Sequence, residues 1–148
     1  MKTLRSITLW LAWAPILTCL ATSFFFHSVN VKDGLADNFV RDIVRDSRGY
    51  MWFSTINGLS RYDGYRFHNY MLHQSGHAND IHFVRETADS TLWMVCVNEL
   101  FTYDRATDTW KADGAARLGK LGMHGSWKLF YVDDRHDLWV ATDNGLFH

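Results

Sequence analysis

Four histidines form the densest group of chemically active side chains in this 148-residue chain, because His68, His73, His77 and His82 fall within fifteen residues. Imidazole is a common metal ligand. His73 and His77 could share the face of a helix, but Ser75-Gly76 between them disfavours helical structure. No cysteine or carboxylate completes a familiar ligand set. We therefore expect a polar connection that contains histidines, with no metal and no cofactor.

The carboxylates and the thiol show no catalytic arrangement. Asp46, Asp63, Asp104 and Asp133 recur beside predicted turns, where aspartate commonly accepts hydrogen bonds from nearby backbone. Cys96 lies in an apolar run, which favours a small buried residue over a nucleophile. We find no serine, histidine and aspartate order typical of a triad and no glycine-rich phosphate loop. The sequence therefore predicts no catalytic residue and no enzymatic activity in this chain.

The elements that position these side chains repeat along the chain. Trp52, Trp93 and Trp139 lie 41 and 46 residues apart, and each is followed seven residues later by a leucine. These leucines are Leu59, Leu100 and Leu146. A period in this range indicates stacked or radially arranged units. We predict that these six residues are structural positions, with the tryptophans packed between neighbouring units; an aromatic platform for a ligand is the alternative.

One repeat reads as four short strands joined by turns. In the first copy the predicted strands are 40–45, 50–55, 59–62 and 65–70, with a hairpin turn at Asn57-Gly58. In the second copy they are 83–86, 92–97, 100–103 and 109–112, and the turn Asn98-Glu99 lacks the glycine. Four antiparallel strands in about forty residues are typical of a propeller blade. The predicted fold class is all-β, an incomplete β-propeller of about two and a half blades after an N-terminal signal or anchor segment.

The N-terminus differs in composition from the repeats. Lys2 and Arg5 precede an uncharged apolar run at 6–26, and Ala21-Thr22-Ser23 offers small residues for cleavage. A signal peptide and an uncleaved membrane anchor both fit this pattern. The predicted division is 1–23 signal or anchor, 24–38 lead-in, 39–80 first blade, 81–126 second blade and 127–148 partial third blade. Residues 24–148 hold 13 Lys and Arg against 16 Asp and Glu without a basic cluster, so we expect no nucleic-acid partner.

Residues 33–67 carry a family resemblance. Asp33-Gly34-Leu35 runs into Asp46-Ser47-Arg48-Gly49 and then into the strand of Trp52 and Asn57-Gly58-Leu59. This stretch resembles the two-component regulator propeller repeat, in particular the start of the periplasmic sensor region of Bacteroidetes-type hybrid two-component histidine kinases. The resemblance implies an exported, periplasmic input domain whose ligands are breakdown products of polysaccharides. No kinase core, nucleotide-binding box or receiver is found in the chain.

A ligand surface in such a fold is expected on the loops that connect blades near the central channel. The candidate binding residues there are Asp37, Asn38, His77, Asn79, Asp80, His124 and Trp127.

Propellers typically close with 4–8 blades, which is more than the repeats found here. We therefore expect a fragment of a longer sensor, whose partners are an oligosaccharide ligand and further blades, with membrane contact only through the N-terminal segment or other regions. Two alternatives remain open from the sequence: a truncated product without independent function or an interaction scaffold, and a fragment of a secreted propeller lyase or hydrolase.

Overall fold

The computed structural model describes residues 25–72 and 76–148. The predicted signal or anchor segment at 1–23 and the candidate ligand His73 lie outside the described residues. None of the described helices is long and apolar enough to cross a bilayer.

Three antiparallel sheets make up the described chain, so the predicted all-β propeller-like fold is confirmed. The first sheet contains β1 (Val40–Arg45), β2 (Met51–Thr55), β3 (Gly58–Tyr62) and β4 (Phe67–Tyr70). The second contains β5 (Ile81–Glu86), β6 (Leu92–Cys96), β7 (Glu99–Asp104) and β8 (Thr109–Lys111). The third contains β9 (Trp127–Val132), β10 (Leu138–Thr142) and β11 (Gly145–Phe147).

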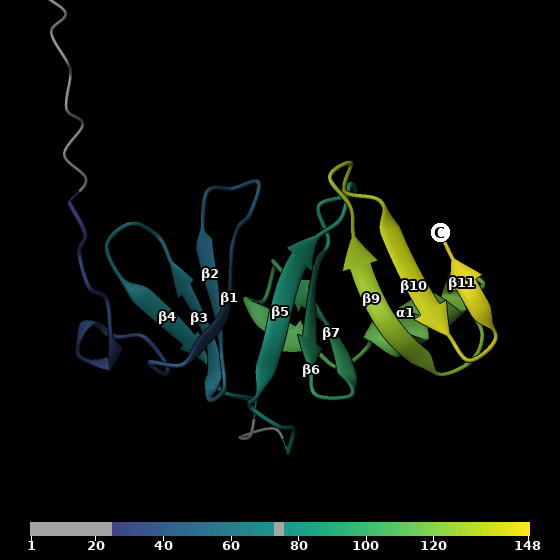
Figure 1. The fold of residues 1–148 in the computed structure, drawn as a ribbon, viewed down its shortest axis with the longest axis horizontal. Coiled ribbons are helices and arrows are strands. Elements are labelled where there is room, and N and C mark those ends of the chain that lie inside the picture. The colour runs from purple at the N-terminus through teal and green to yellow at the C-terminus, as the bar shows by residue number, and fades with distance from the viewer. Residues whose placement is uncertain (1–24, 73–75) are drawn as a thin grey trace, which may run out of the picture.

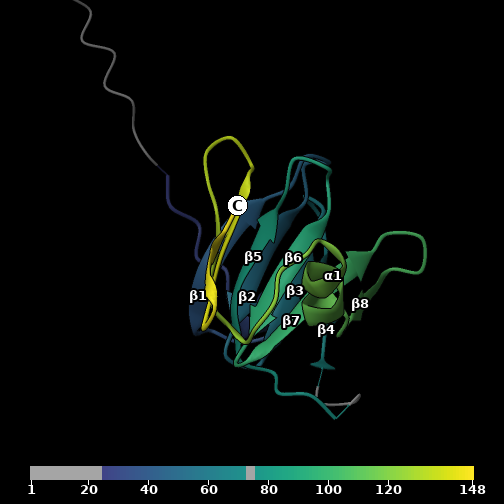
Figure 2. The ribbon, with the colours of Figure 1, turned by 90° about the vertical axis from the view of Figure 1, so that its right-hand side faces the viewer.

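The sheets stand side by side in chain order, with the first and third at opposite ends (Figure 1). Figure 2 looks along this row and places β1 on one side and β4, β8 and α1 on the other. Strands β1, β5 and β9 are each the first strand of their sheet, and β1 and β5 lie against each other. This is the radial arrangement of neighbouring propeller blades.

The core lies between the sheets because each strand alternates its side chains between two faces. We call the face that carries the repeat tryptophan the forward face. Trp52 and Leu59 on the forward face of the first sheet pack with Val84, Met94 and Phe101 on the rear face of the second.

The same contact recurs one sheet along. Trp93 and Leu100 on the forward face of the second sheet pack with Phe130, Val132 and Val140 on the rear face of the third. Burial of these aliphatic and aromatic side chains, at about 1.5–3 kcal/mol for each fully buried one, is the main force that holds neighbouring sheets together.

The hairpin turns lie one residue earlier than the sequence predicted. Thr55 pairs with Gly58, so the first loop is Ile56-Asn57 and Gly58 begins β3 with φ 125°. Cys96 pairs with Glu99, so the second loop is Val97-Asn98. Because the second copy has glutamate where the first has glycine, the left-handed conformation moves to Val97, at φ 49°.

Two short helices in the described residues were not predicted. The 3₁₀ helix η1 (Val31–Asp33) begins with a capping box between Asn30 and Asp33. The α-helix α1 (Gly114–Lys120) packs on β7. Gly114 lies so close to that strand that a Cβ there would meet Leu100 at 2.5 Å, which explains why this position is glycine.

Candidate functional site

The repeat tryptophans are anchored by the turns that precede them. The carboxylate of Asp46 accepts hydrogen bonds from Trp52 Nε1 at 3.1 Å and from backbone amides of its own turn. Asp133 does the same for Trp139, at 3.0 Å. The turn role predicted for the four repeated aspartates is confirmed, since Asp63 and Asp104 also accept from nearby backbone amides. These carboxylates therefore serve structure.

In the second sheet a threonine replaces the aspartate. Thr87 Oγ1 accepts from Trp93 Nε1 at 3.3 Å and donates to Asp89 at 2.7 Å. The Asp89 carboxylate in turn accepts from the amide of Thr91 at 3.0 Å. The carboxylate thus lies two residues later than Asp46 does in the first turn. The hydroxyl of Thr87 lies between this carboxylate and the indole and bonds to both.

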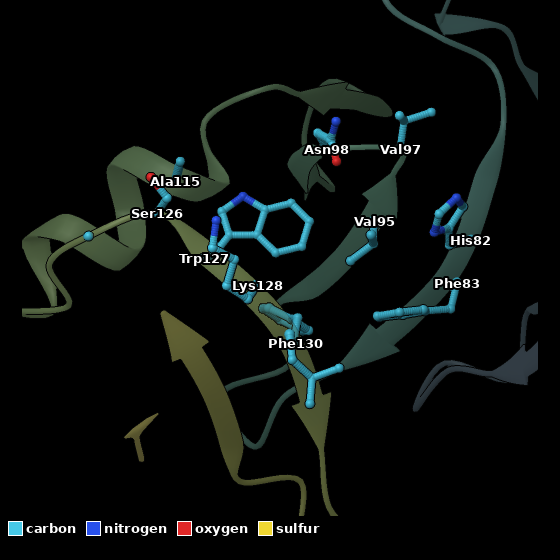
Figure 3. A pocket seen from close by; sticks show the side chains of 12 residues that line it. His82, Phe83, Val95, Val97, Asn98, Ala115, Ser126, Trp127, Lys128 and Phe130 are labelled. Atoms are coloured by element: carbon cyan, nitrogen blue, oxygen red, sulfur yellow. The ribbon is translucent and has the colours of Figure 1, made fainter. Parts of the chain in front are cut away.

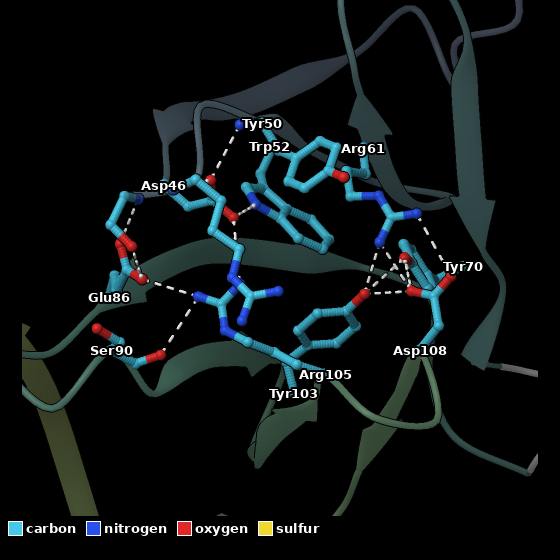
Figure 4. Close-up of polar contacts among 12 residues, drawn as sticks. Asp46, Tyr50, Trp52, Arg61, Tyr70, Glu86, Ser90, Tyr103, Arg105 and Asp108 are labelled. Carbon is cyan, nitrogen blue, oxygen red and sulfur yellow. Dashed lines mark hydrogen bonds and ion pairs between the residues drawn. The ribbon is translucent and has the colours of Figure 1, made fainter.

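A polar cluster joins the first and second sheets (Figure 4). Arg61 on β3 donates to Asp108 at 2.8 Å and to Tyr103 Oη at 2.6 Å. Tyr70 donates to Asp108 at 2.6 Å, and Tyr103 donates to the same carboxylate. The guanidinium also lies 5.7 Å from the centre of the Trp52 ring. Every charged member is paired, so the cluster fastens two sheets and leaves no group poised for acid or base chemistry.

The titration behaviour of this cluster follows from burial and hydrogen bonding. Burial raises the pKa of Tyr70 far above its ordinary value, and its hydrogen bonds with Asp108 and Tyr103 raise it further. Burial opposes ionisation of Asp108, but hydrogen bonds from Tyr103, Tyr70 and Arg61 outweigh it and hold its pKa below the ordinary value. The cluster therefore consists of neutral phenols around one ion pair at neutral pH.

A second ionic bridge joins the same two sheets and is also visible in Figure 4. Glu86 accepts from the backbone amide and the hydroxyl of Ser47, at 2.7 and 2.8 Å, and from Arg105 at 2.8 Å. Arg105 also approaches Asp46 at 3.7 Å. The bridge therefore connects the second sheet to the turn of the first sheet that anchors Trp52.

A pocket with a volume of about 850 Å³ opens between the second and third sheets (Figure 3). Its wall combines apolar side chains with a few polar groups, and the lining side chains that matter most are those of His82, Phe83, Asn98, Trp127, Lys128 and Phe130. A cavity of 300–1,000 Å³ with convergent polar groups is the usual form of a small-molecule site. This pocket is the candidate functional site.

Among the residues predicted to bind a ligand, Trp127 lines this pocket and His124 is exposed in the loop before it. The others lie elsewhere in contacts that hold the fold. Asp37 accepts from the amide of Phe39, Asn38 accepts from the amide of Val31, His77 contacts Glu99, Asn79 donates to Asn57, and Asp80 pairs with Arg41. The structure therefore does not gather the seven candidates into one site.

Sequence reasoning missed His82 and Lys128 as lining residues, although a signal was present. Each lies eleven residues before a repeat tryptophan, and so does Arg41. All three positions are the extra residue of a β-bulge, where the register of the first strand against its partner shifts. Bulges redirect a side chain and are common beside functional sites.

Neither the thiol nor the histidines form a reactive centre in the described part of the chain. Burial raises the pKa of Cys96 to about 11, and its Sγ donates to the carbonyl of Ala78 at 3.0 Å. Among residues 25–72 and 76–148, no three His, Cys, Asp or Glu side chains group closely enough to hold a metal ion.

Comparisons with known proteins match part of much longer chains. Histidine kinase P4 of Formosa agariphila is 35% identical over 65 residues, which are 44% of this chain and 5% of that protein. One extracellular domain of a hybrid two component system from B. thetaiotaomicron is 19% identical, with a TM-score of 0.62, over 86% of this chain and 18% of that domain. Another is 23% identical, with a TM-score of 0.54, over 82% of this chain and 18% of that domain.

The family match agrees with the repeat and the fold. The model of the two component regulator propeller family matches residues 34–57, from the lead-in through β2 to the first hairpin turn. Residues 34–57 therefore match the two component regulator propeller repeat, on a chain that shares its fold with the extracellular domains of hybrid two component systems.

Proposed function

We propose that this chain is the N-terminal part of a ligand-sensing β-propeller, which lies in the periplasm and belongs to a two-component sensor. The matched repeat and the fold of extracellular sensor domains support this function. The basic head and apolar run at the N-terminus support export. A ligand derived from a carbohydrate follows from the family resemblance. No kinase activity is assigned to this chain.

The repeat leucines differ in exposure, and this difference supports the proposal that further blades belong to the functional unit. Leu59 is 0% exposed and Leu100 is 3% exposed, because the next sheet covers each of them. Leu146, at the equivalent position, is 67% exposed. Leu129 and Tyr131 lie on the same forward face and are also exposed. An apolar face of this kind, on a repeat that elsewhere buries it, fits one more blade of the same kind.

The proposal is tested first at the gene. Sequencing beyond the codon for His148 should show an open frame with further Trp-bearing repeats, a membrane-spanning helix and a kinase core. A stop codon followed by no trace of a repeat would contradict the sensor assignment and favour a product without independent function. A downstream frame without a kinase core would instead favour a secreted propeller enzyme.

Export is tested with fusions that join residues 1–38 to alkaline phosphatase or to β-galactosidase in a Gram-negative host. We expect active phosphatase and inactive galactosidase, since the first enzyme folds only in an oxidising compartment. The opposite pair of activities would refute a periplasmic location. N-terminal sequencing of the exported fusion then separates cleavage near Ser23 from a retained anchor.

A further inference from the structure

The three bulges place a nitrogen-bearing side chain at the same point of each sheet. Arg41, His82 and Lys128 are the bulged residues, and all three side chains are exposed. A bulge twists the strand locally and turns its extra side chain away from the regular alternation. Because β1, β5 and β9 hold the same place in their sheets, each sheet presents one nitrogen-bearing side chain at the bulge of its first strand.

We call the interface between two neighbouring sheets a junction. The bulged side chains make different contacts at the two junctions. Between the first and second sheets, Arg41 binds Asp80 through two hydrogen bonds of 2.7 and 2.8 Å, and Arg85 binds Asp42. Counted from the repeat tryptophans, the positions that match Asp80 and Asp42 in the next junction are Ser126 and Phe83. Both carboxylates have been replaced, so the ion pairs that close the first junction have no counterpart in the second.

The open junction is the pocket of about 850 Å³. His82 and Lys128 line it, Asn98 and Ser126 add polar groups, and no aspartate or glutamate lies in its wall. The carboxylate of Asp143 accepts from the amide of the lining residue Ser126 at 2.9 Å. A pocket with two basic side chains and no carboxylate favours an anion.

Aromatic side chains form the rest of the wall. Trp127 begins β9, and Figure 3 shows its indole extending from that strand towards Val95, with Asn98 at the hairpin nearby. Phe83 and Phe130 also line the pocket, with ring centres 6.3 Å apart. The half-buried rings of Trp127 and Phe83, beside the buried ring of Phe130, offer an apolar surface to a ring.

The loop before Trp127 is fixed against the last hairpin. Gly125 has φ 97°, and a Cβ there would meet the carboxylate of Asp143 at 2.2 Å, so only glycine fits. Asp143 N donates to the carbonyl of Ser126 at 3.2 Å, which closes this contact from both sides. On the opposite wall, Val97 is held in the left-handed region, where a β-branched residue is rare. Local strain of this kind concentrates at ligand sites.

We propose that this pocket binds a ring compound that carries a carboxylate, with the carboxylate at Lys128 and the ring against Trp127. The assignment of this ligand to sensing rests on the proposed function, whereas binding itself is measured without signalling. The ring can be aromatic or a sugar with an apolar face, since both stack on an indole.

The test is calorimetric titration of the full chain with two acids and their uncharged counterparts, which are benzoate against benzamide and glucuronate against glucose. We expect one acid to bind at least about tenfold more tightly than its counterpart, the loss expected for one charge-assisted hydrogen bond. Binding of benzoate assigns an aromatic ring, and binding of glucuronate assigns a sugar ring. Equal affinity for acid and counterpart, or binding of neither acid, would overturn the proposal.

Variants locate the site. Lys128→Gln removes the charge, leaves a polar side chain that is one atom shorter, and should weaken binding of the acid by roughly tenfold without affecting the uncharged compound. Lys32→Gln removes an exposed lysine outside the pocket and should bind as the parent does. Trp127→Phe should weaken both compounds of the pair. An equal loss from Lys128→Gln and Lys32→Gln would place any binding elsewhere. The gene and export tests do not depend on these binding results, so the proposed function and the ligand proposal can fail independently.

Discussion

Trp52 is held at two places, by rings of the neighbouring sheet and by the turn that precedes it. The ring of Trp52 lies 5.3 Å from Tyr103 and 5.6 Å from Trp110 of the neighbouring sheet. Its N–H is fixed by Asp46 from the preceding turn. An indole fills the space between two sheets and also satisfies its one donor, which no aliphatic side chain can do.

In an intact parent, Trp52→Ala should lower the free energy of unfolding by about 3–5 kcal/mol, since it removes a fully buried ring and leaves a cavity. The measurement is chemical denaturation followed by circular dichroism. Tyr65→Ala, which removes an aromatic ring that is 91% exposed, is the matched control and should change little. In an intact parent the ligand affinity of folded Trp52→Ala should stay near normal. Normal stability with lost ligand binding would make Trp52 a recognition residue.

Tyr70→Phe should make the chain less sensitive to alkaline pH. The pKa of Tyr70 in the folded chain lies above its unfolded value of 10.0, mainly because the ring is buried. Stability from the protonated phenol is therefore complete below pH 10 and declines as the pH rises further. Thermal midpoints measured from pH 8 to 11 should fall more steeply in the parent than in the variant. Parallel curves would show that Tyr70 does not govern this range.

At the scale of elements, the two hairpins differ in which residue takes a positive φ. In the first hairpin Gly58 takes the positive φ, whereas in the second Val97 takes it. A left-handed non-glycine residue costs of order 1–3 kcal/mol. The strand pairing on both sides of the loop keeps this conformation in place, because Cys96 and Glu99 still pair.

Val97→Asn should raise the free energy of unfolding by about 1 kcal/mol, since asparagine adopts the left-handed region more readily than valine. Ile56→Asn is the matched control, because Ile56 occupies the same loop position in the first hairpin, is 41% exposed like Val97 and has no positive φ. It should give no gain. Denaturation of both variants under the same conditions compares them. An equal effect at the two positions would refute the strain assigned to Val97.

At the scale of the whole molecule, the exposed forward face of the third sheet favours self-association. Leu129, Tyr131 and Leu146 expose apolar surface on it, at 62%, 55% and 67%. The rear face of the first sheet is partly covered by the lead-in, where Leu35 is buried and the amide of Ala36 donates to Ser60. The row of sheets is therefore covered unequally at its two ends.

Residues 24–148 expressed by themselves should self-associate or unfold without one steep transition, because apolar patches and open strand edges favour association. Leu129→Lys combined with Leu146→Lys should shift the molecules towards monomer in sedimentation velocity. Tyr65→Lys adds a charge at another exposed site and should leave the distribution unchanged. A parent that is monomeric and melts in one sharp transition would contradict this expectation.

Local sequence determined the strands and turns of this protein. Period-two alternation and the aspartates of the turns are properties of neighbouring residues, so β1, β2 and β6 were predictable to within about a residue. The resemblance at Asp33 to Phe67 likewise depends on a continuous stretch, and the matched family repeat at 34–57 lies within it.

Tertiary structure decided the site. Arg41 meets Asp80 across 39 residues, and His82 and Lys128, from separate sheets, line the same pocket. Such contacts depend on where a bulge shifts the register and on which carboxylates survive at a junction. The contacts across a junction cannot be read from one segment of the sequence, because the packing of two whole sheets determines which side chains meet. Sequence periodicity therefore determined the blades, and only their packing decided which junction is closed by ion pairs and which is open.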